Sequence, residues 1–425
     1  MGNRLLPGQN PVAGYLRVAA GFSRSALLYL LANFLVSVGM SFYGVLFNLY
    51  LTEGGLQEGI IGTILSLSGL ALVVSAIPAG LLSDRLGRRR AMAIGVSTGA
   101  LLAALRALTV NGPWLLALSF LGGIASTIYS LSTAPFMMEN SREEERTHLF
   151  SASFAVMLLA GVMGNLAAGA LPAAIGLIPG VNSFVAYRAS LLAGSAIFLA
   201  AWFPLSRISE GPPAPAESSQ TGLGSLARGL MSAKGFVWCN LWIGLGAGLV
   251  IPFFNLYFAK RFGASSGQIG LYFSVSQMFT LAAVMAGPAL ARRFGKVRTV
   301  VAMELLSLPF LISLGAEKAL PLAVISFWMR ASLMQMSSPI SSAFMMEVVP
   351  GYSRATVNSI ATMAWNISWT FSTAFSGWVM QNYGYAIPYY LTAFCYAVSA
   401  VSFYLLFNKR ELGRAVDGRA GQIDG

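Results

Sequence analysis

The chain has 425 residues, of which 56% are hydrophobic and only 10% charged, with a formal net charge of +12. Ordinary soluble domains carry about 25% charged residues, so a soluble protein of this composition could not cover its surface with polar groups. The composition therefore excludes a water-soluble protein and indicates that lipid is the main solvent of this chain.

Twelve apolar runs follow one another along the chain, and each is long enough to cross a bilayer core of about 30 Å as a helix. The first six are predicted near Ser25–Leu51, Gly59–Leu82, Ala91–Val110, Pro113–Phe136, His148–Leu171 and Phe184–Leu205. The last six are predicted near Phe236–Phe258, Gln268–Ala291, Thr299–Leu314, Leu320–Met346, Val357–Gln381 and Tyr385–Phe407. The residues before Ser25 contain no cleavable signal-peptide pattern, so the first helix is expected to act as its own insertion signal. The predicted fold class is an all-α membrane protein with twelve transmembrane helices in two pseudo-symmetric six-helix bundles.

The segment between the sixth and seventh helices divides the chain. Residues 206–232 are rich in Pro, Gly, Ser and Ala, which is the composition of a linker. The predicted domains are therefore two six-helix bundles at residues 1–205 and 233–425, the second ending in a short tail. With both termini placed in the cytoplasm, most Lys and Arg residues lie in cytoplasmic loops, as the positive-inside rule requires. We expect a multi-pass protein of the cell membrane with both termini cytoplasmic.

The two halves are repeats of one another. The sequence FNLY occurs at residues 47–50 and again at 254–257, and FMME occurs at 136–139 and again at 344–347. After the first pair the offset stays at 208 residues, and it relates Gly59, Gly62, Gly87, Arg88 and Arg146 to Gly267, Gly270, Gly295, Lys296 and Arg354. Repeats of six helices insert in the same orientation, a plan typical of transporters whose substrate site lies at the midplane between the halves.

A charged motif follows the second helix. It reads GLLSDRLGRRR over residues 80–90, and its second copy carries Arg292 where the first has Asp84. The motif closely resembles the GxxxDRxGRR signature of the major facilitator superfamily, and it lies where that family has it, between helices 2 and 3. The resemblance covers the whole chain and implies a secondary transporter that works by alternating access, with features of the drug-efflux branch.

The motif residues are candidates for a cytoplasmic gate. Gly80 would let two helices approach closely and Gly87 would allow a tight turn. Asp84 could bind a neighbouring helix N-terminus or an arginine, and the arginine cluster around Arg88 could bind the carboxylates that end the fourth helix. Such contacts would close the cytoplasmic side while the protein faces outward. The candidate gating residues are Gly80, Asp84, Arg85, Gly87, Arg88, Glu139, Arg146, Arg292, Gly295, Lys296, Glu347 and Arg354. The alternative is that the arginines only fix the topology.

A polar stripe runs along the tenth helix. Arg330, Met334, Ser337 and Ser341 recur at helical spacing, and their counterparts in the fourth helix are Gly122, Ser126, Tyr129 and Thr133. The resemblance implies that helices 1, 4, 7 and 10 line a central cavity. Because Gly122 has no charge, we expect that cavity to be asymmetric. The candidate substrate-binding residues are Arg330, Ser126, Tyr129, Thr133, Ser337, Ser341, Asn33, Asn240, Gln277 and Trp365.

Three functions remain open. The first is efflux of small amphiphilic compounds, favoured by the motif and by an aromatic, charge-poor cavity. The second is transport of an anionic metabolite or lipid-like molecule held by Arg330, whose alternative role is a structural ion pair. The third is a non-transporting sensor of transporter fold. Against the efflux branch, the fourth helix lacks the arginine that the drug–proton exchangers of the family typically have.

Cofactor and metal chemistry are not expected. Cys239 and Cys395 lie inside apolar helices without a CxxC spacing, His148 is the only histidine, and the chain has no P-loop. We therefore predict no enzyme activity, no nucleic-acid partner and a monomer in the bilayer, with transport coupled to a proton or sodium gradient. Glu304 is the only acid well inside a predicted helix. The resemblance implies that its helix is peripheral, and the helix begins near Lys296. We therefore expect Glu304 close to the cytoplasmic interface, with proton coupling as the less favoured role.

Overall fold

The computed structural model describes residues 22–209, 223–316, 318–349 and 354–423. These residues are almost wholly helical, with no strand among them, and the predicted fold of twelve membrane helices is confirmed. The short helices α8 and α10 continue α7 and α9, so each of these two pairs counts as one of the twelve. Ten of these helices stand out as membrane spans by length and composition. The other two, α13 and α14, are long enough to span a membrane but carry more polar residues, among them Arg330 in α13 and Asn358 and Asn366 in α14.

The first half contains the helices α2 to α8. Their bounds are α2 Arg24–Glu53, α3 Glu58–Leu86, α4 Arg88–Leu108, α5 Gly112–Glu139, α6 Glu143–Ile175, α7 Ser183–Ala200 and α8 Trp202–Ser206. Side-chain caps define several of the starts, because the first backbone N–H groups of a helix have no partner within it. Ser23, Asn111 and Asn182 accept hydrogen bonds from the N–H groups of the first turns of α2, α5 and α7.

The second half contains the helices α9 to α15. Their bounds are α9 Leu223–Val250, α10 Phe254–Phe262, α11 Ser266–Phe294, α12 Lys296–Ala316, α13 Leu320–Val348, α14 Arg354–Tyr383 and α15 Ala386–Ile423. A 3-10 turn at Ile251–Phe253 separates α9 from α10. Pro252 lies in this turn, and a proline interrupts a helix because it has no N–H to donate.

Two predicted boundaries differ from the structure. Residues 210–222 of the predicted linker lie outside the described residues, and α9 begins at Leu223, inside the segment assigned to the linker. The last helix continues to Ile423 and is not limited to the predicted end at Phe407. The polar composition of both segments hid their helical structure.

Glycine makes the turn after the second helix of each half. Gly87 has φ 88° and Gly295 has φ 87°, which is the left-handed region that residues with a Cβ rarely adopt. The predicted role of Gly87 in a tight turn is confirmed. We call the side of the molecule with these two turns the inner side, since the positive-inside rule predicts it to be cytoplasmic, and the opposite side the outer side.

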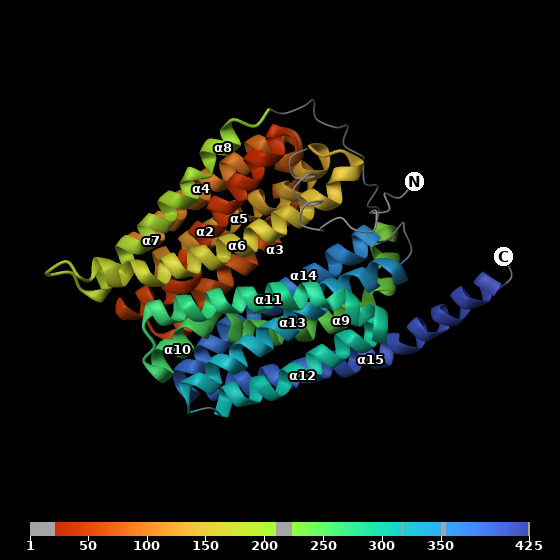
Figure 1. The fold of residues 1–425 in the computed structure, drawn as a ribbon. Coiled ribbons are helices and arrows are strands. Elements are labelled where there is room, and N and C mark those ends of the chain that lie inside the picture. The colour runs from red at the N-terminus through yellow and green to blue at the C-terminus, as the bar shows by residue number, and fades with distance from the viewer. Residues whose placement is uncertain (1–21, 210–222, 317, 350–353, 424–425) are drawn as a thin grey trace, which may run out of the picture.

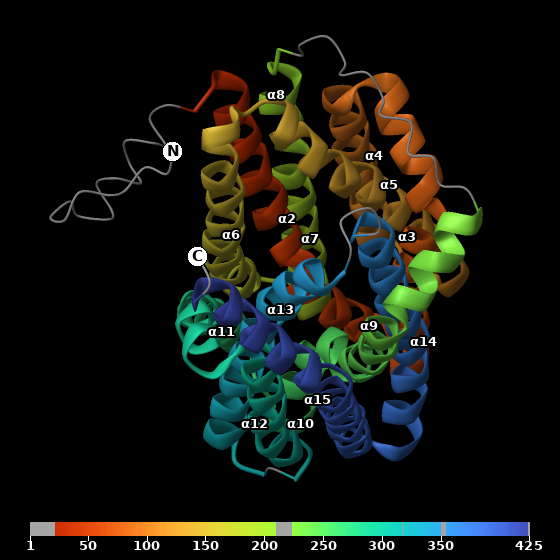
Figure 2. The same ribbon diagram turned by 90° about the vertical axis from the view of Figure 1, so that its right-hand side faces the viewer.

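The two halves join at the outer side and diverge towards the inner side. Figure 1 shows the bundle α2–α8 above the bundle α9–α15, with the two meeting near α10 and separating towards the other end. Contacts between halves run along α3 with α14, α6 with α11, and α2 with α10 and α11. Figure 2 shows the same separation seen from the open side.

The buried core follows this division. One apolar cluster contains residues of both halves, including Phe47, Tyr50, Phe254 and Tyr257 of the two FNLY repeats. Towards the inner side the core splits into separate clusters, one around Phe136 in the first half and one around Phe344 in the second. The halves therefore share one core only at the outer side.

Candidate functional site

A hydrogen-bonded pair of asparagines joins the halves in the shared core. Asn48 and Asn255 are the repeated asparagines of FNLY, and both are buried. The Asn48 Nδ2 donates to Asn255 Oδ1 over 2.9 Å and to the carbonyl of Pro252 over 2.7 Å. Asn255 Nδ2 donates in return to the carbonyl of Val45 over 3.1 Å. Both side-chain amide nitrogens thus have hydrogen-bond acceptors in an apolar core, where an unpaired polar group would be costly.

Two glycine crossings complete the outer closure. A Cβ on Gly62 of α3 would lie 2.9 Å from the Cα of Gly377 of α14, and a Cβ on Gly270 of α11 would lie 2.9 Å from the Cα of Gly169 of α6. The offset of 208 residues relates Gly62 to Gly270 and Gly169 to Gly377. Each half therefore contributes one glycine to each crossing, and small residues let the backbones touch.

A polar contact between α3 and the start of α15 lies beside one crossing. The Tyr385 hydroxyl donates to Glu58 Oε1 over 3.0 Å. Burial, followed by the charge of Glu58, raises the pKa of Tyr385 above its ordinary value. The hydroxyl therefore stays protonated and remains a donor to the carboxylate.

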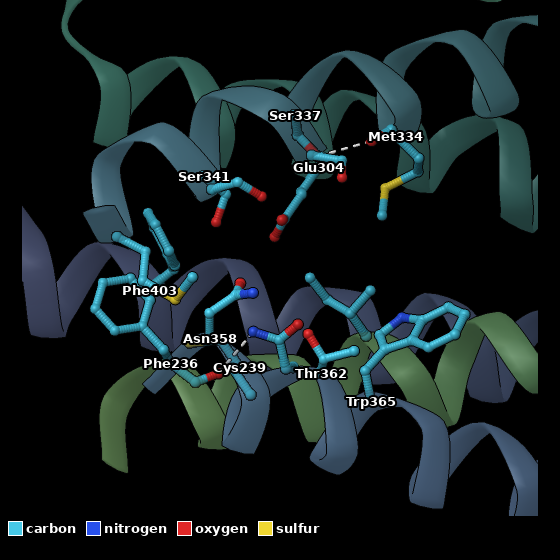
Figure 3. A pocket seen from close by; sticks show the side chains of 16 residues that line it. Phe236, Cys239, Glu304, Met334, Ser337, Ser341, Asn358, Thr362, Trp365 and Phe403 are labelled. Atoms are coloured by element: carbon cyan, nitrogen blue, oxygen red, sulfur yellow. Dashed lines mark hydrogen bonds between the residues drawn. The ribbon is translucent and has the colours of Figure 1, made fainter. Parts of the chain in front are cut away.

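A pocket opens in the inner part of the second half, between α9, α12, α13 and α14. Its volume is about 160 Å³. Figure 3 shows Ser337 and Ser341 of α13 on one side of it, and Asn358, Thr362 and Trp365 on the other. The lining combines hydroxyls and amides with aromatic, aliphatic and methionine side chains: Phe236, Cys239, Asn240, Ile243, Glu304, Met334, Ser337, Ser338, Ser341, Ser342, Met345, Asn358, Ala361, Thr362, Trp365 and Phe403.

Glu304 of α12 is the one acid among these lining residues. Its side chain is only 2% exposed and points into the pocket. Its Oε2 has no hydrogen-bond partner among the described residues, and no ion pair joins it to a basic side chain there. Although its helix was expected to be peripheral, α12 turns this side chain inward, so Glu304 lines the pocket and does not lie at an exposed interface.

Comparison with known proteins fits this architecture. The model of the Major Facilitator Superfamily matches residues 29–251 and 236–422. The chain belongs to the major facilitator superfamily. Among solved structures of the superfamily fold, the nucleoside transporter NupG superposes with a TM-score of 0.75 at 17% identity, covering 90% of this chain and 99% of that one. A bacterial homologue of the human lysosomal transporter Spinster, inward-facing and occupied, gives 0.72 at 15% identity over 95% and 98% of the two chains.

One curated relative matches more locally. A "Na(+), Li(+), K(+)/H(+) antiporter" of Planococcus maritimus is 26% identical over 144 residues. The match covers 33% of this chain and 34% of the relative, so it spans about a third of each protein.

The superfamily signature forms a charge cluster within the first half. Arg88 contacts Asp84 Oδ1 at 2.5 Å and Glu139 Oε1 at 3.1 Å. In the second half Lys296 pairs with Glu347, and these two residues correspond to Arg88 and Glu139 in the repeat. The predicted pairing with carboxylates that end the fourth helix is confirmed. Because each cluster joins helices of one half, however, neither cluster closes the inner side in this conformation.

The other gating candidates have varied surroundings. A Cβ on Gly80 would meet nothing within 4 Å, so the predicted close helix approach at Gly80 is wrong for this conformation. Arg85 and Arg292 are exposed. Arg354 donates from Nε to the carbonyl of Val349, whereas the buried Nε of Arg146 has no partner among the described residues.

A further contact at the inner turn was not predicted. Glu411 of α15 accepts hydrogen bonds from the backbone N–H groups of Lys296 over 2.6 Å and Val297 over 3.0 Å. A carboxylate at the N-terminus of a helix satisfies unpaired donors and favours the helix dipole. No local pattern relates residues so distant in sequence, so nothing in the sequence could have indicated this cap.

Four of the ten predicted substrate-binding residues line the pocket: Asn240, Ser337, Ser341 and Trp365. The others lie elsewhere. Asn33 donates to Ser153 of α6, Tyr129 is buried in the first half, and Gln277 lies against Gly161 at the contact of α11 with α6. Ser126 is exposed, and Thr133 donates to the carbonyl of Ser130 within α5.

Arg330 does not lie among the residues of the pocket. It is 4% exposed, its guanidinium donates to the Tyr396 hydroxyl over 2.5 Å, and it covers the ring of Phe254 at 5.7 Å. These contacts place it inside the helix bundle of the second half. The structure therefore shows a packed, hydrogen-bonded arginine at the position predicted to bind substrate.

The first half contains an arginine in the equivalent place, supplied by another helix. The guanidinium of Arg106 of α4 would lie 3.8 Å from a Cβ on Gly122, the counterpart of Arg330. It covers the ring of Phe47 at 5.3 Å, as Arg330 covers Phe254. The first half therefore holds a guanidinium beside Gly122, although Gly122 itself carries no charge. The predicted asymmetry of the cavity stays a prediction.

Pocket residues that the sequence analysis missed include Asn358 and Thr362, and Glu304 was named there but not placed in the substrate site. Asn358, Thr362 and Trp365 are spaced by four and three residues, so they share one face of α14. That spacing was a usable signal. Glu304 had no such pattern, since only the tertiary packing of α12 directs its side chain into the pocket.

Proposed function

We propose that this chain is a secondary active transporter that exports small amphiphilic compounds by alternating access. The observation that supports export most directly is the pocket of the second half, which combines apolar and hydrogen-bonding groups. Its exposed lining residues, Ser338, Ser342, Asn358 and Thr362, lie towards the inner side. A compound from the cytoplasm or the inner leaflet would meet this opening first.

The composition of the pocket favours an amphiphile over an anion. Trp365, Phe236, Phe403 and two methionines offer apolar contact, while hydroxyls and amides offer hydrogen bonds. No basic side chain lines the pocket among the described residues, and Arg330 is already bonded to Tyr396. An anionic ligand would therefore bring its charge into an apolar site without a cation to pair with, which is costly.

The arrangement of the halves supports alternating access. They share a core, the asparagine pair and the glycine crossings at the outer side, while their inner cores are separate. Rocking about this outer contact would expose the pocket to each side in turn. The name of the curated relative, an antiporter, favours exchange as the form of coupling, and its short match leaves the substrate open.

The test is transport by purified protein in proteoliposomes, with ethidium, Hoechst 33342 and tetraphenylphosphonium as probes. We expect movement of at least one probe, and a loss of about tenfold in its rate for Trp365→Ala, equivalent to about 1.4 kcal/mol. Trp114→Ala is the matched control, because Trp114 is 66% exposed at the outer end of α5 and far from the pocket residues.

Two results would contradict the proposal. One is unchanged transport by Trp365→Ala, which would remove the pocket from the substrate path. The other is binding of a probe, seen as thermal stabilisation, without transport of any probe by protein that remains folded in the liposomes. That second result would favour a sensor.

A further inference from the structure

Glu304 presents a buried charge without a partner. Its carboxylate is 2% exposed, and Oε2 accepts no hydrogen bond from the described residues. An ionised carboxylate taken out of water is strongly destabilised unless an opposite charge or several hydrogen bonds compensate it. The described residues provide neither an ion pair to this carboxylate nor a hydrogen bond to Oε2, so a bound cation is the natural source of the compensating charge.

The groups that face Glu304 do not include an available cation. Cys239 of α9 and Tyr396 of α15 are within electrostatic reach, and both are uncharged in their ordinary form. Arg330 of α13 is bonded to the Tyr396 hydroxyl, and no ion pair joins it to Glu304. Arg292 and Arg293 of α11 are exposed near the inner end of that helix.

The pocket does offer oxygen atoms. Asn240 uses its Nδ2 to donate to the carbonyl of Phe236 over 2.9 Å, which leaves Oδ1 as an acceptor. Ser337 donates its hydroxyl proton to the carbonyl of Met334 over 2.8 Å, which leaves lone pairs on Oγ. Ser341 also lines the pocket, on the same face of α13. Carboxylate, amide and hydroxyl oxygens are the ligands that hard cations prefer.

The size of the pocket limits what can bind. Its volume of about 160 Å³ is below the roughly 300–1,000 Å³ that drug-sized ligands occupy. Ser337 and Cys239 in the lining are buried like Glu304, whereas Ser338 and Asn358 at the pocket opening are exposed. A small cation can therefore reach the carboxylate from the inner side, while a larger amphiphile would bind at the pocket opening, next to Asn358 and Thr362, and extend beyond it.

We propose that Glu304 is a binding site for a monovalent cation, either the proton or an alkali-metal ion, and that this cation is the coupling ion of the transporter. The cation neutralises the Glu304 carboxylate inside the pocket of the second half. The binding part stands on the geometry alone, and the coupling part rests on the proposed transport function.

Coupling follows from the position of the site. Glu304 lies in the same pocket as Trp365, so substrate and cation are bound by the same group of helices. Closing the pocket around an ionised Glu304 would bury an unpaired charge, which is costly. The change from the inward-open to the outward-open state should therefore be faster with the cation bound than without it. Removing the charge permanently should then separate substrate movement from the ion gradient.

The binding experiment uses purified full-length protein in detergent with the isosteric variant Glu304→Gln. Thermal unfolding is recorded in NaCl, LiCl, KCl and choline chloride at equal ionic strength and at several pH values, and proton release is recorded in weakly buffered solution. Glu53→Gln is the matched control, because Glu53 is an exposed carboxylate at the outer end of α2.

We expect the wild type and Glu53→Gln to take up or release about one proton per chain on titration of this site, a change that Glu304→Gln loses. Alkali-metal stabilisation relative to choline that also disappears in Glu304→Gln identifies a metal ion as a ligand. A pH response without an alkali-metal response identifies the proton alone. Wild-type proton and alkali-metal responses in Glu304→Gln would overturn the proposal.

A transport arm separates this proposal from the proposed function. In proteoliposomes, Glu304→Gln is expected to lose ethidium accumulation driven by a pH or sodium gradient to a much greater extent than it loses ethidium counterflow, while Glu53→Gln keeps both. Gradient-driven accumulation that persists in Glu304→Gln would overturn the coupling role. If the wild type itself moves no probe, the proposed function fails, while the cation site is still decided by the binding experiment.

Discussion

At the scale of single residues, the asparagine pair holds the two halves together at the outer side. Asn48 and Asn255 bond to each other and to backbone carbonyls of the opposite half. Interhelical hydrogen bonds in membranes contribute on average only about 0.6 kcal/mol each. Removing one asparagine should cost more than this average, because the side-chain amide of the other asparagine would be left without its partner in a core without water.

We therefore expect Asn48→Ala to lower the free energy of unfolding by roughly 1–3 kcal/mol, measured by chemical or thermal unfolding in detergent. Asn382→Ala should have little effect, because Asn382 is exposed and bonds only to the carbonyl of Trp378 in its own helix. Equal stability of the two variants would show that the pair does not hold the halves together.

The residue scale is also where prediction from sequence was weakest. FNLY was recognisable as a repeat, but the sequence could not show that its two asparagines bond to each other. Arg330 was conspicuous because a charge inside an apolar helix is rare, yet Tyr396 accounts for its position. Contacts between residues hundreds of positions apart decide both cases, and a single sequence does not contain them.

At the scale of helices, the glycine crossings set how closely the halves can approach. A methyl group on Gly62 would lie 2.8 Å from the carbonyl oxygen of Thr373. Real Cβ atoms do not come so close, so α3 and α14 would have to separate at the outer side.

Gly62→Ala should therefore shift the protein towards the state that is open on the outer side, although alanine is the better helix former by about 1 kcal/mol. Spin labels at Arg90 and Arg298, both exposed near the inner turns, would report this as a shorter distance between the halves. Gly44→Ala is the control, since a Cβ there meets nothing within 4 Å. The interpretation fails if both variants give the wild-type distance distribution.

Helices were the most predictable level of the structure. Lipid requires every spanning segment to satisfy its own backbone groups, so apolar length nearly dictates where helices lie. The errors came from polar segments, since α9 begins and α15 ends in sequence that reads as linker or tail. The turn glycines Gly87 and Gly295 were predictable for the same local reason, because a positive φ favours glycine.

At the scale of the whole molecule, the two halves keep an arginine in the same place by different means. Arg106 of α4 and Arg330 of α13 each cover the phenylalanine of FNLY, and the Nε of each is buried without a partner. Leu314 and Gly122 stand at the corresponding positions of the opposite halves. The two halves thus place a guanidinium group at the same point in space, although the two arginines do not align in the repeated sequences.

This equivalence can be tested by moving the arginine within the first half. Arg106→Leu should lower stability and transport, and Gly122→Arg alone should lower both further by placing two guanidinium groups together. The double variant Arg106→Leu/Gly122→Arg should recover at least about half of either loss, measured as a double-mutant cycle. Additive losses would show that the two sites are not interchangeable.

The glycine crossings also have a mechanical consequence. Gly62 lies near the outer end of α3, and Leu86 ends the same helix at the inner side. At a rise of 1.5 Å per residue the two are about 36 Å apart, so a tilt of roughly 10° at the crossing would move the inner end by about 6 Å. A small change in the angle between two helices at the glycine crossing is therefore enough to open or close the passage between the halves at the inner side.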